Sequence, residues 1–377
     1  MTWTLSRFRT GELVEVRSKE EIFATLDQHG CVDGMPFMPE MLQFCGQRFR
    51  VSAVAHKTCE TAFQTWKGRR LDATVHLSGL WCDGSAHGGC EAKCNLFWKD
   101  VWLKPVCDFG GGSTRPSGDA SNAPIGGSSE TQLLANTRLP AGEEGNEPLY
   151  LCQATRLYEA TEPLAWWDPR QYVFDVVTRN HSVGRVLRVL WLASLRWFFP
   201  RVRFGYRLYK AFHDWMHLSL SGRPSPSWGG QIEAGAPTPT GRLDLKPGEY
   251  VQIKTQREIE QTLDKASKNR GLSFDPGDMA PYCGRVFKVR CSVTKIIDEA
   301  TGKMRHMKQP CIMLEGVVCQ GEYAGCRLNC PRAIPSYWRE IWLERVNDHA
   351  TVTPVGNSDS VGGTAEPGTC SVVVTGS

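Results

Sequence analysis

The chain has 377 residues, 41% apolar and 10% aromatic, so it is long enough for two or three domains with apolar cores and cannot be disordered throughout. Its formal net charge is only +4, from 44 Lys and Arg against 40 Asp and Glu. This balance excludes a protein that is basic overall, and nucleic acid is therefore not an expected partner.

The sequence shows neither an export signal nor a transmembrane helix. The first residues lack the apolar core of a secretory signal, and arginines interrupt the most hydrophobic stretch, residues 183–199. We therefore expect a cytoplasmic protein, with peripheral association with a membrane as a further option. In a reducing compartment, clusters among the 15 cysteines bind metal more often than they form disulfides.

Residues 1–107 are predicted to form the first of two similar modules. Leu13–Val16 alternates as a strand does, and Ser18 with Glu21 fits the capping box that starts a short helix. Residues 49–54, 74–80 and the region around Trp102 also read as strands. Four cysteines of this module form the first candidate metal site: Cys45, Cys82, Cys90 and Cys94. His87, between two of them, is interpreted as a loop residue rather than a ligand.

Residues 108–148 are rich in Gly, Ser, Asn and Thr and are predicted to be a flexible linker. Residues 149–220 form a basic, aromatic helical segment. One helix is predicted to start at the N-cap Ser182 and to stop at Pro200, and a second follows directly. Such a pair could dock on a protein partner or an anionic membrane surface through residues 182–220. The alternative is an ordinary helical hairpin that packs on the two modules. We favour this hairpin interpretation.

Residues 221–243 are expected to be a second linker, residues 244–346 the second module, and residues 347–377 a disordered tail. The second module repeats the first nearly motif for motif. GELVEVRSKEEIFATLD corresponds to GEYVQIKTQREIEQTLD, FCGQRFRV to YCGRVFKV, and WKDVWL to WREIWL. Met41, Lys57 and the first cysteine align with Met279, Lys295 and Cys283. We interpret this correspondence as an internal duplication.

The second candidate metal site consists of the cysteines that recur in the second module: Cys283, Cys319, Cys326 and Cys330. In each module the last three cysteines form a knuckle, C-x7-C-x3-C in the first and C-x6-C-x3-C in the second, with glycines that let the chain turn. Four thiolates suit tetrahedral Zn²⁺, and an iron-sulfur cluster is the alternative. Seven cysteines have no counterpart and are not expected to be ligands: Cys31, Cys59, Cys107, Cys152, Cys291, Cys311 and Cys370.

Together these features predict a mainly β, α+β fold. It comprises two tandem modules, each an SH3-like barrel or bent sheet with one short helix and a four-cysteine knuckle, joined by the helical segment and the linkers. The leading functional hypothesis is a zinc-stapled scaffold or accessory protein that docks on a partner or a membrane surface. The second is an iron-sulfur redox or biosynthetic enzyme with a small substrate between the modules. Catalysis is left open, because no established catalytic motif occurs.

Overall fold

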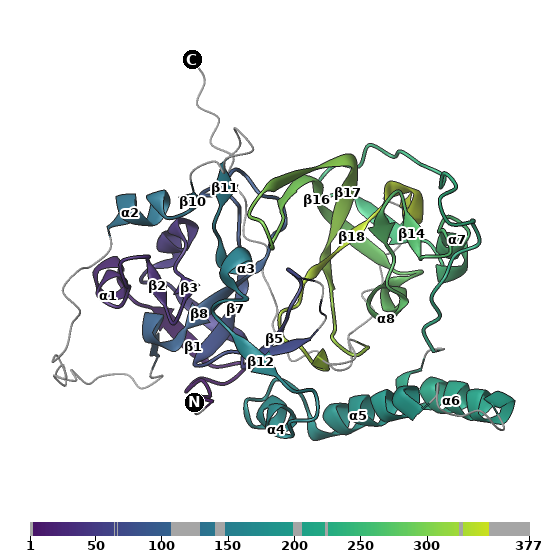
Figure 1. Ribbon diagram of the computed structural model, residues 1–377, viewed down its shortest axis with the longest axis horizontal. Helices are drawn as coiled ribbons and strands as arrows, with labels where there is room; N and C mark the ends of the chain where they lie inside the picture. Colours follow the sequence, from purple (N-terminus) through teal and green to yellow (C-terminus); the bar gives the residue numbers. More distant parts are fainter. Residues whose placement is uncertain are drawn as a thin grey trace, which may run out of the picture. The chain divides into compact units, whose positions relative to one another are not determined.

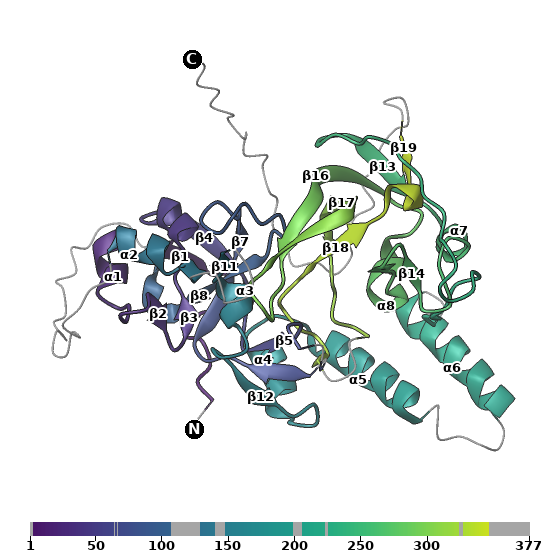
Figure 2. The same cartoon turned by 45° about the horizontal axis from the view of Figure 1, so that its top comes forward.

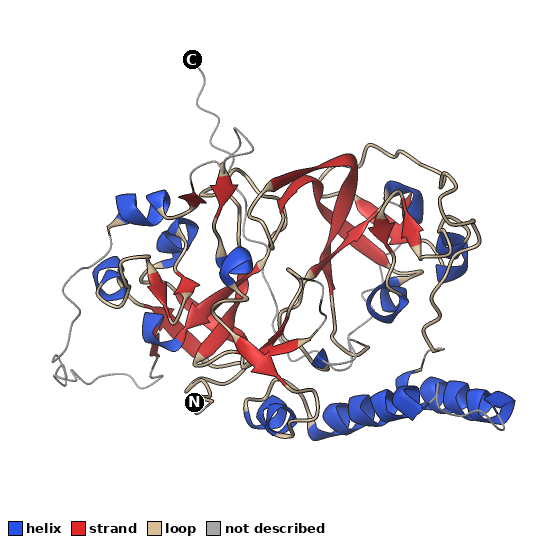
Figure 3. Ribbon diagram, in the orientation of Figure 1, coloured by secondary structure: helices blue, strands red, loops and turns tan. Residues whose placement is uncertain are grey.

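The structure is a computed structural model and describes residues 3–63, 65, 67–106, 129–139, 148–198, 206–222, 225–323 and 327–346. It is a mixed α and β protein with more strand (30%) than helix (26%), arranged in several small sheets (Figures 1 and 3), as the sequence predicts. We call residues 1–106 the first half, residues 244–346 the second half, and residues 149–222 the middle segment.

The first half is built on a five-stranded antiparallel sheet with the strand order β8-β7-β4-β1-β9. Its strands are β1 (Leu13–Val16), β4 (Arg48–Val54), β7 (Thr74–Trp81), β8 (Asn95–Lys99) and β9 (Leu103–Pro105). Val14 pairs with Phe49, and Val51 with Leu77, so that alternate residues of β1 and β4 face the core. The strands predicted over Leu13–Val16, 49–54 and 74–80 are confirmed.

The second half has a five-stranded antiparallel sheet with the order β18-β17-β16-β13-β19. Its strands are β13 (Tyr250–Ile253), β16 (Val286–Ile297), β17 (Met304–Val318), β18 (Pro335–Trp338) and β19 (Leu343–Arg345). Val251 pairs with Phe287 and Val289 with Leu314, the residues that align with the pairs in the first sheet. The two sheets therefore share strand order and register.

Short helices cover the two cores. Both predicted capping boxes are confirmed: Ser18 caps α1 (Lys19–Phe23) with Glu21, and Thr255 caps α7 (Gln256–Glu260) with Glu258. The Trp102 region differs from its prediction, because Trp102 ends a 3₁₀ turn, η2 (Asp100–Trp102), before β9 begins. The turn carries the indole into the first core, where Trp98 and Trp102 are fully buried, as Trp338 and Trp342 are in the second core.

The remaining short elements connect and extend the halves. In the first half they are β2 (Cys31–Val32), β3 (Met35–Pro36), η1 (Pro39–Phe44), β5 (Lys57–Cys59) and β6 (Gly68–Arg70). In the second half they are β14 (Lys268–Asn269), β15 (Leu272–Ser273), α8 (Pro276–Met279), η4 (Ala280–Tyr282) and η6 (Glu340–Trp342). The β5-β6 hairpin of the first half and the outer part of the β16-β17 hairpin each reach the opposite half, as the hydrogen bonds described below show.

The middle segment contains β11 (Leu149–Tyr150), α3 (Gln153–Arg156), β12 (Glu162–Leu164), α4 (Arg170–Val177), α5 (Val183–Phe198) and α6 (Tyr206–Ser221). Ser182 accepts a hydrogen bond from the Arg185 N–H, which confirms the predicted N-cap of α5. Figure 1 shows α4, α5 and α6 along one edge of the molecule, and the turned view of Figure 2 shows that α5 and α6 are not end to end but run in roughly opposite directions.

The first predicted linker is not devoid of structure. Residues 129–139 form α2 (Glu130–Ala135) and β10 (Arg138–Leu139), and Leu133 is buried against the first core. Most of the rest of the linker lies outside the described residues, as does the predicted tail, residues 347–377. Residues 225–243 carry no helix or strand of their own, although Ile232 forms an isolated bridge with Asp264.

Candidate metal centre

The first half holds a small cavity beneath its cysteine-rich loop. The knuckle folds back because Gly84, at φ +79°, packs its Cα directly against the Cys90 backbone, where a Cβ would lie 2.0 Å from the Cys90 oxygen. The cavity is about 30 Å³, room for one ion or one water molecule. Its lining comes from the knuckle, from η1, from α3 and from β16 with the turn after it: Met38, Glu40, Cys82, His87, Cys90, Ala92, Cys94, Leu96, Cys152, Gln153, Ala154, Ile297 and Glu299.

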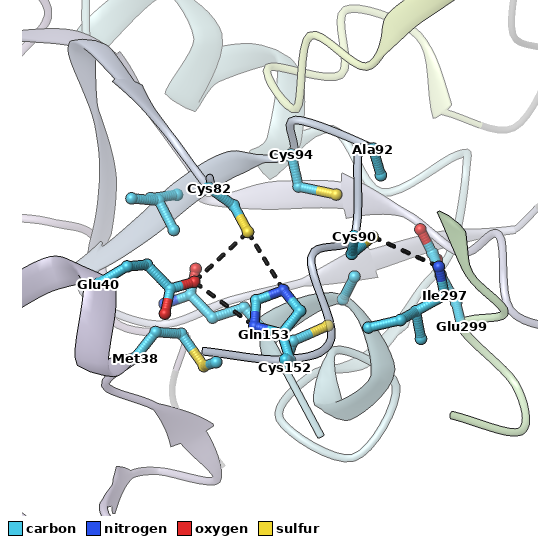
Figure 4. A pocket seen from close by; sticks show the side chains of 13 residues that line it. Met38, Glu40, Cys82, Cys90, Ala92, Cys94, Cys152, Gln153, Ile297 and Glu299 are labelled. Atoms are coloured by element: carbon cyan, nitrogen blue, oxygen red, sulfur yellow. Dashed lines mark hydrogen bonds and ion pairs between the residues drawn. The ribbon is translucent and has the colours of Figure 1, made fainter. Parts of the chain in front are cut away.

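Three of these side chains bring an oxygen, a sulfur and a nitrogen to one point. The Cys82 thiol donates a hydrogen bond of 3.4 Å to Glu40 Oε1, and its Sγ lies 3.3 Å from His87 Nε2 (Figure 4). His87 Nδ1 lies 3.7 Å from Glu40 Oε1. Within the described part of the chain, this is the one group of three or more His, Cys, Asp or Glu side chains whose ligand atoms all lie within 4.8 Å of one another. These residue types are those that bind zinc.

The group is buried without enough hydrogen bonds to satisfy it. Glu40 is 6% exposed and His87 is 1% exposed, yet Glu40 Oε2 and His87 Nδ1 have no hydrogen-bond partner among the described residues. Such orphaned atoms cost free energy unless a water molecule or an ion contacts them. Of the two, an ion would also offset the burial of a carboxylate.

Burial shifts the three side chains of this group toward their neutral forms. It raises the pKa of the Glu40 carboxyl to about 7 and lowers the pKa of the His87 imidazole to about 4. Burial, with the Glu40 carboxylate adding to it, raises the pKa of the Cys82 thiol far above its usual range. A divalent cation would reverse this preference for Glu40 and Cys82, because it stabilises their ionised forms directly.

Four thiols line this cavity, but they are not the four cysteines that the sequence predicts as the first metal site. Cys82, Cys90 and Cys94 line it, together with Cys152 at the start of α3 (Figure 4). Cys45 is not among the lining residues. It is the C-cap of η1 and packs on the first core, and its nearest electrostatic neighbours are Lys19 and Glu20 rather than another cysteine. The structure therefore brings three of the four predicted residues together and adds Cys152.

The second half repeats the carboxylate and thiol pair of the first. Cys319 donates a hydrogen bond of 3.1 Å to Asp278 Oδ2, and Asp278 aligns with Glu40 because each acid directly precedes the recurring methionine. The neighbouring Cys330 thiol of the second half, together with the Arg332 guanidinium, lowers the pKa of the Cys59 thiol to about 6. Cys283 has Glu260 as its electrostatic neighbour, and Cys326 lies outside the described residues.

Sequence reasoning missed four side chains: Glu40, Asp278, Cys59 and Cys152. It found His87 but interpreted it as a plain loop residue. His87 does lie in the turn of the knuckle, yet its side chain is buried against Cys82. The recurring acid before Met41 and Met279 was a usable signal for Glu40 and Asp278. Nothing in the spacing of Cys59 or Cys152 signalled a role. Metal binding at the eight predicted cysteines remains a prediction.

No protein-family model and no curated protein sequence matches this chain.

A second candidate feature is the surface formed by α4, α5 and α6. Of the 21 exposed large apolar side chains in the described residues, 11 belong to these three helices. On α5, Val183, Leu187, Trp191 and Trp197 are exposed at helical spacing, and every exposed described position of this helix is uncharged. Trp215 and Leu208 continue the row on α6.

The arginines of α5 face the second half instead of solvent. Arg188 forms an ion pair of 2.8 Å with Glu322, and Arg185 donates to the Gln320 carbonyl. Arg196 donates to the Tyr323 carbonyl. These contacts agree with a helical hairpin whose arginines bind the second half. They leave the apolar row, the exposed Val183, Leu187, Trp191 and Trp197 of α5 with Leu208 and Trp215 of α6, accessible to solvent. Through the whole described part of the chain, the helices are too short or too polar to cross a lipid bilayer.

Proposed function

We propose that the chain is a duplicated zinc-binding module that serves as a scaffold or accessory protein, with its first metal centre at Glu40, Cys82 and His87. The observation that carries the proposal is the buried contact of these three side chains, with Glu40 Oε2 and His87 Nδ1 unsatisfied. Duplication is supported by the common strand order and register of the two sheets, since unrelated sheets would have no reason to share both.

The mixed ligand set favours zinc over an iron-sulfur cluster. Zinc accepts nitrogen, oxygen and sulfur ligands in one tetrahedral site, and we propose as its fourth ligand one of the three other cysteines that line the cavity, Cys90, Cys94 or Cys152, after a small movement of that side chain. A fourth protein ligand closes the site, which supports a structural role over a catalytic one. An iron-sulfur cluster, the alternative, would be held by the four thiols alone and would need the walls of a 30 Å³ cavity to move apart.

Elemental analysis of the purified full-length protein tests this proposal. Cys82→Ser and His87→Ala should each lower the zinc content by one equivalent per chain, because each removes a ligand from a buried site. Cys31→Ser is the matched control, since Cys31 is buried to a similar degree in the same half but does not line the cavity. Iron with inorganic sulfide and a brown colour would contradict the zinc assignment, and wild-type protein without metal would contradict both.

We further propose that the row on α4, α5 and α6 docks on an anionic lipid surface. Tryptophan and leucine on one face of a helix suit the boundary between headgroups and acyl chains. Residues 170–222 carry nine Lys and Arg against two Asp, a net +7, whereas the chain as a whole is only +4, so the remainder is −3. The exposed row thus belongs to a part of the chain with a net positive charge, which favours anionic lipid over a protein partner.

Co-sedimentation with vesicles tests the docking proposal. The protein should bind vesicles of phosphatidylcholine with 30% phosphatidylserine (about a third anionic lipid) more tightly than vesicles of phosphatidylcholine alone. Leu187→Ser combined with Trp191→Ser should weaken binding about tenfold or more, because both side chains are at least half exposed. Trp228→Ser, an equally exposed tryptophan outside the three helices, should leave binding unchanged. Absence of binding to either vesicle would contradict this proposal and leave the zinc centre untouched.

A further inference from the structure

A second, larger cavity lies beside the metal cavity, where residues 133–139 fold over the first half. Its volume is about 290 Å³, against about 30 Å³ for the metal cavity, and it opens to solvent. Its walls come from β2-β3 and the residues that flank it, from α2 and β10, and from α3 with Leu151 before it (Figure 1). Pockets for small ligands start at about 300 Å³, so its size suits a compact organic molecule.

The charged side chains that line this second cavity are two arginines, Arg138 and Arg156, and no Asp or Glu lines it. The Arg138 side chain, on β10, forms no hydrogen bond or ion pair with a described residue. Arg156, on α3, pairs through Nη1 with Glu159 at 2.6 Å, but the Glu159 side chain is 62% exposed and lies outside the lining. Such an exposed pair is weak, so both guanidiniums remain able to bind an anion.

Much of the remaining wall is apolar. Phe37 and Leu133 are buried members of the first core, whereas Leu139 is 44% exposed. The Thr137 hydroxyl already donates to the Ala86 and Leu134 carbonyls, which leaves the arginines as the strongest polar contacts on offer. A ligand that fits this lining therefore has an apolar body to cover the leucines and an anionic group for the guanidiniums.

We propose that this second cavity binds a small organic carboxylate with a compact apolar body. The planar guanidinium of Arg138 or Arg156 can donate two parallel hydrogen bonds to a carboxylate, an arrangement that gives both strength and orientation. An inorganic anion would use the same arginines but would leave the apolar wall in contact with water. Met38 lines both cavities, yet neither arginine lines the metal cavity, so the inference does not rest on the zinc proposal.

Fluorine NMR of 4-fluorobenzoate with the full-length protein tests the proposal. Wild-type protein should shift or broaden the fluorine resonance, with a dissociation constant of about 1 mM or tighter. Arg138→Gln and Arg156→Gln should each weaken binding about tenfold, because each removes a charged donor. Arg9→Gln is the matched control, since Arg9 is an exposed arginine of the first half that does not line this cavity. It should leave binding unchanged.

Competition on unmutated protein tests the two parts of the ligand without dependence on the variants. Benzoate should displace 4-fluorobenzoate at a concentration at least about tenfold lower than benzamide, which lacks the charge, or inorganic phosphate, which lacks the apolar body. No binding of 4-fluorobenzoate, or equal binding by both arginine variants and wild type, would overturn the site. Benzamide or phosphate competing as well as benzoate would overturn the ligand class. None of these outcomes bears on the zinc content.

Discussion

The two cysteine loops occupy equivalent places on equivalent sheets but recruit different third partners. In the first half, Glu40 and Cys82 are joined by His87 from the same loop. In the second half, Asp278 and Cys319 recur, but Tyr323 stands near the position of His87 and hydrogen-bonds with His217 of α6. The backbone framework thus tolerates a change of partner, because these side chains come from loops and short helical turns rather than from the middle of the sheet. The aligned residues of the two halves provide matched variants that test how far the equivalence extends.

The largest expected contrast is between Lys57 and its counterpart Lys295. Lys57 is 2% exposed and forms an ion pair of 2.7 Å with the fully buried Asp175, whereas Lys295 is partly exposed and donates to the Gly88 carbonyl. Lys57→Met should lower the free energy of unfolding by about 3–5 kcal/mol, because it removes the cation that offsets a buried carboxylate and leaves Asp175 only the contact of 3.3 Å with His56 Nε2. Lys295→Met should cost about 1 kcal/mol.

Urea unfolding followed by tryptophan fluorescence measures both variants. Equal decreases in the free energy of unfolding for the two variants would show that Lys57 and Lys295 lie in more similar environments than their contacts indicate.

A pH-dependent contrast follows from His76, which aligns with Met313 of β17. Burial lowers the pKa of His76 to about 4, below its unfolded value of about 6.5, and its Nε2 lacks a hydrogen-bond partner among the described residues. As the pH falls below 6.5, the unfolded chain takes up a proton that the folded protein refuses until about pH 4, so stability decreases in that window.

His76→Met places the second half's residue in the first half and should remove this component, which reaches about 2 kcal/mol at pH 5. The measurement is the difference between unfolding free energies at pH 7 and pH 5 for wild type and variant. An unchanged difference would mean that His76 is already protonated in the folded protein at pH 5.

The smallest expected effects are at the two capping boxes, where the halves should behave alike. Ser18→Ala and Thr255→Ala each remove a side-chain acceptor for the N3 backbone N–H, of Glu21 and of Glu258 respectively. Each should cost about 1 kcal/mol in thermal or urea unfolding. A clear difference between them would indicate that one short helix is supported mainly by its tertiary contacts, such as the buried Ile22 or Ile259.

Local patterns in the sequence predicted most of the elements and part of the candidate site. Alternation located β1, β4 and β7, and capping residues located the starts of α1, α7 and α5, because these signals depend on neighbours within one turn or one strand. Trp102 was assigned to a strand because apolar spacing cannot distinguish a 3₁₀ turn from the strand that follows it. The structured residues 129–139 were missed because they are ordered by long-range contacts, namely the burial of Leu133 in the first core and the hydrogen bond from Thr137 to the Ala86 carbonyl.

The sequence by itself determined most strands and helix starts of each half, since the residues that specify them lie close together along the chain. Only the tertiary structure decided which side chains surround the knuckle cysteines. Cys152 lines the first cavity from the start of α3, and Cys59 at the end of β5 contacts Arg332 of the second half. Cys45 packs on the first core instead of lining the cavity. The physical reason is that the members of a buried polar group need only proximity in space, and that proximity is set by how sheets and hairpins pack. Spacing along the chain carries no record of it.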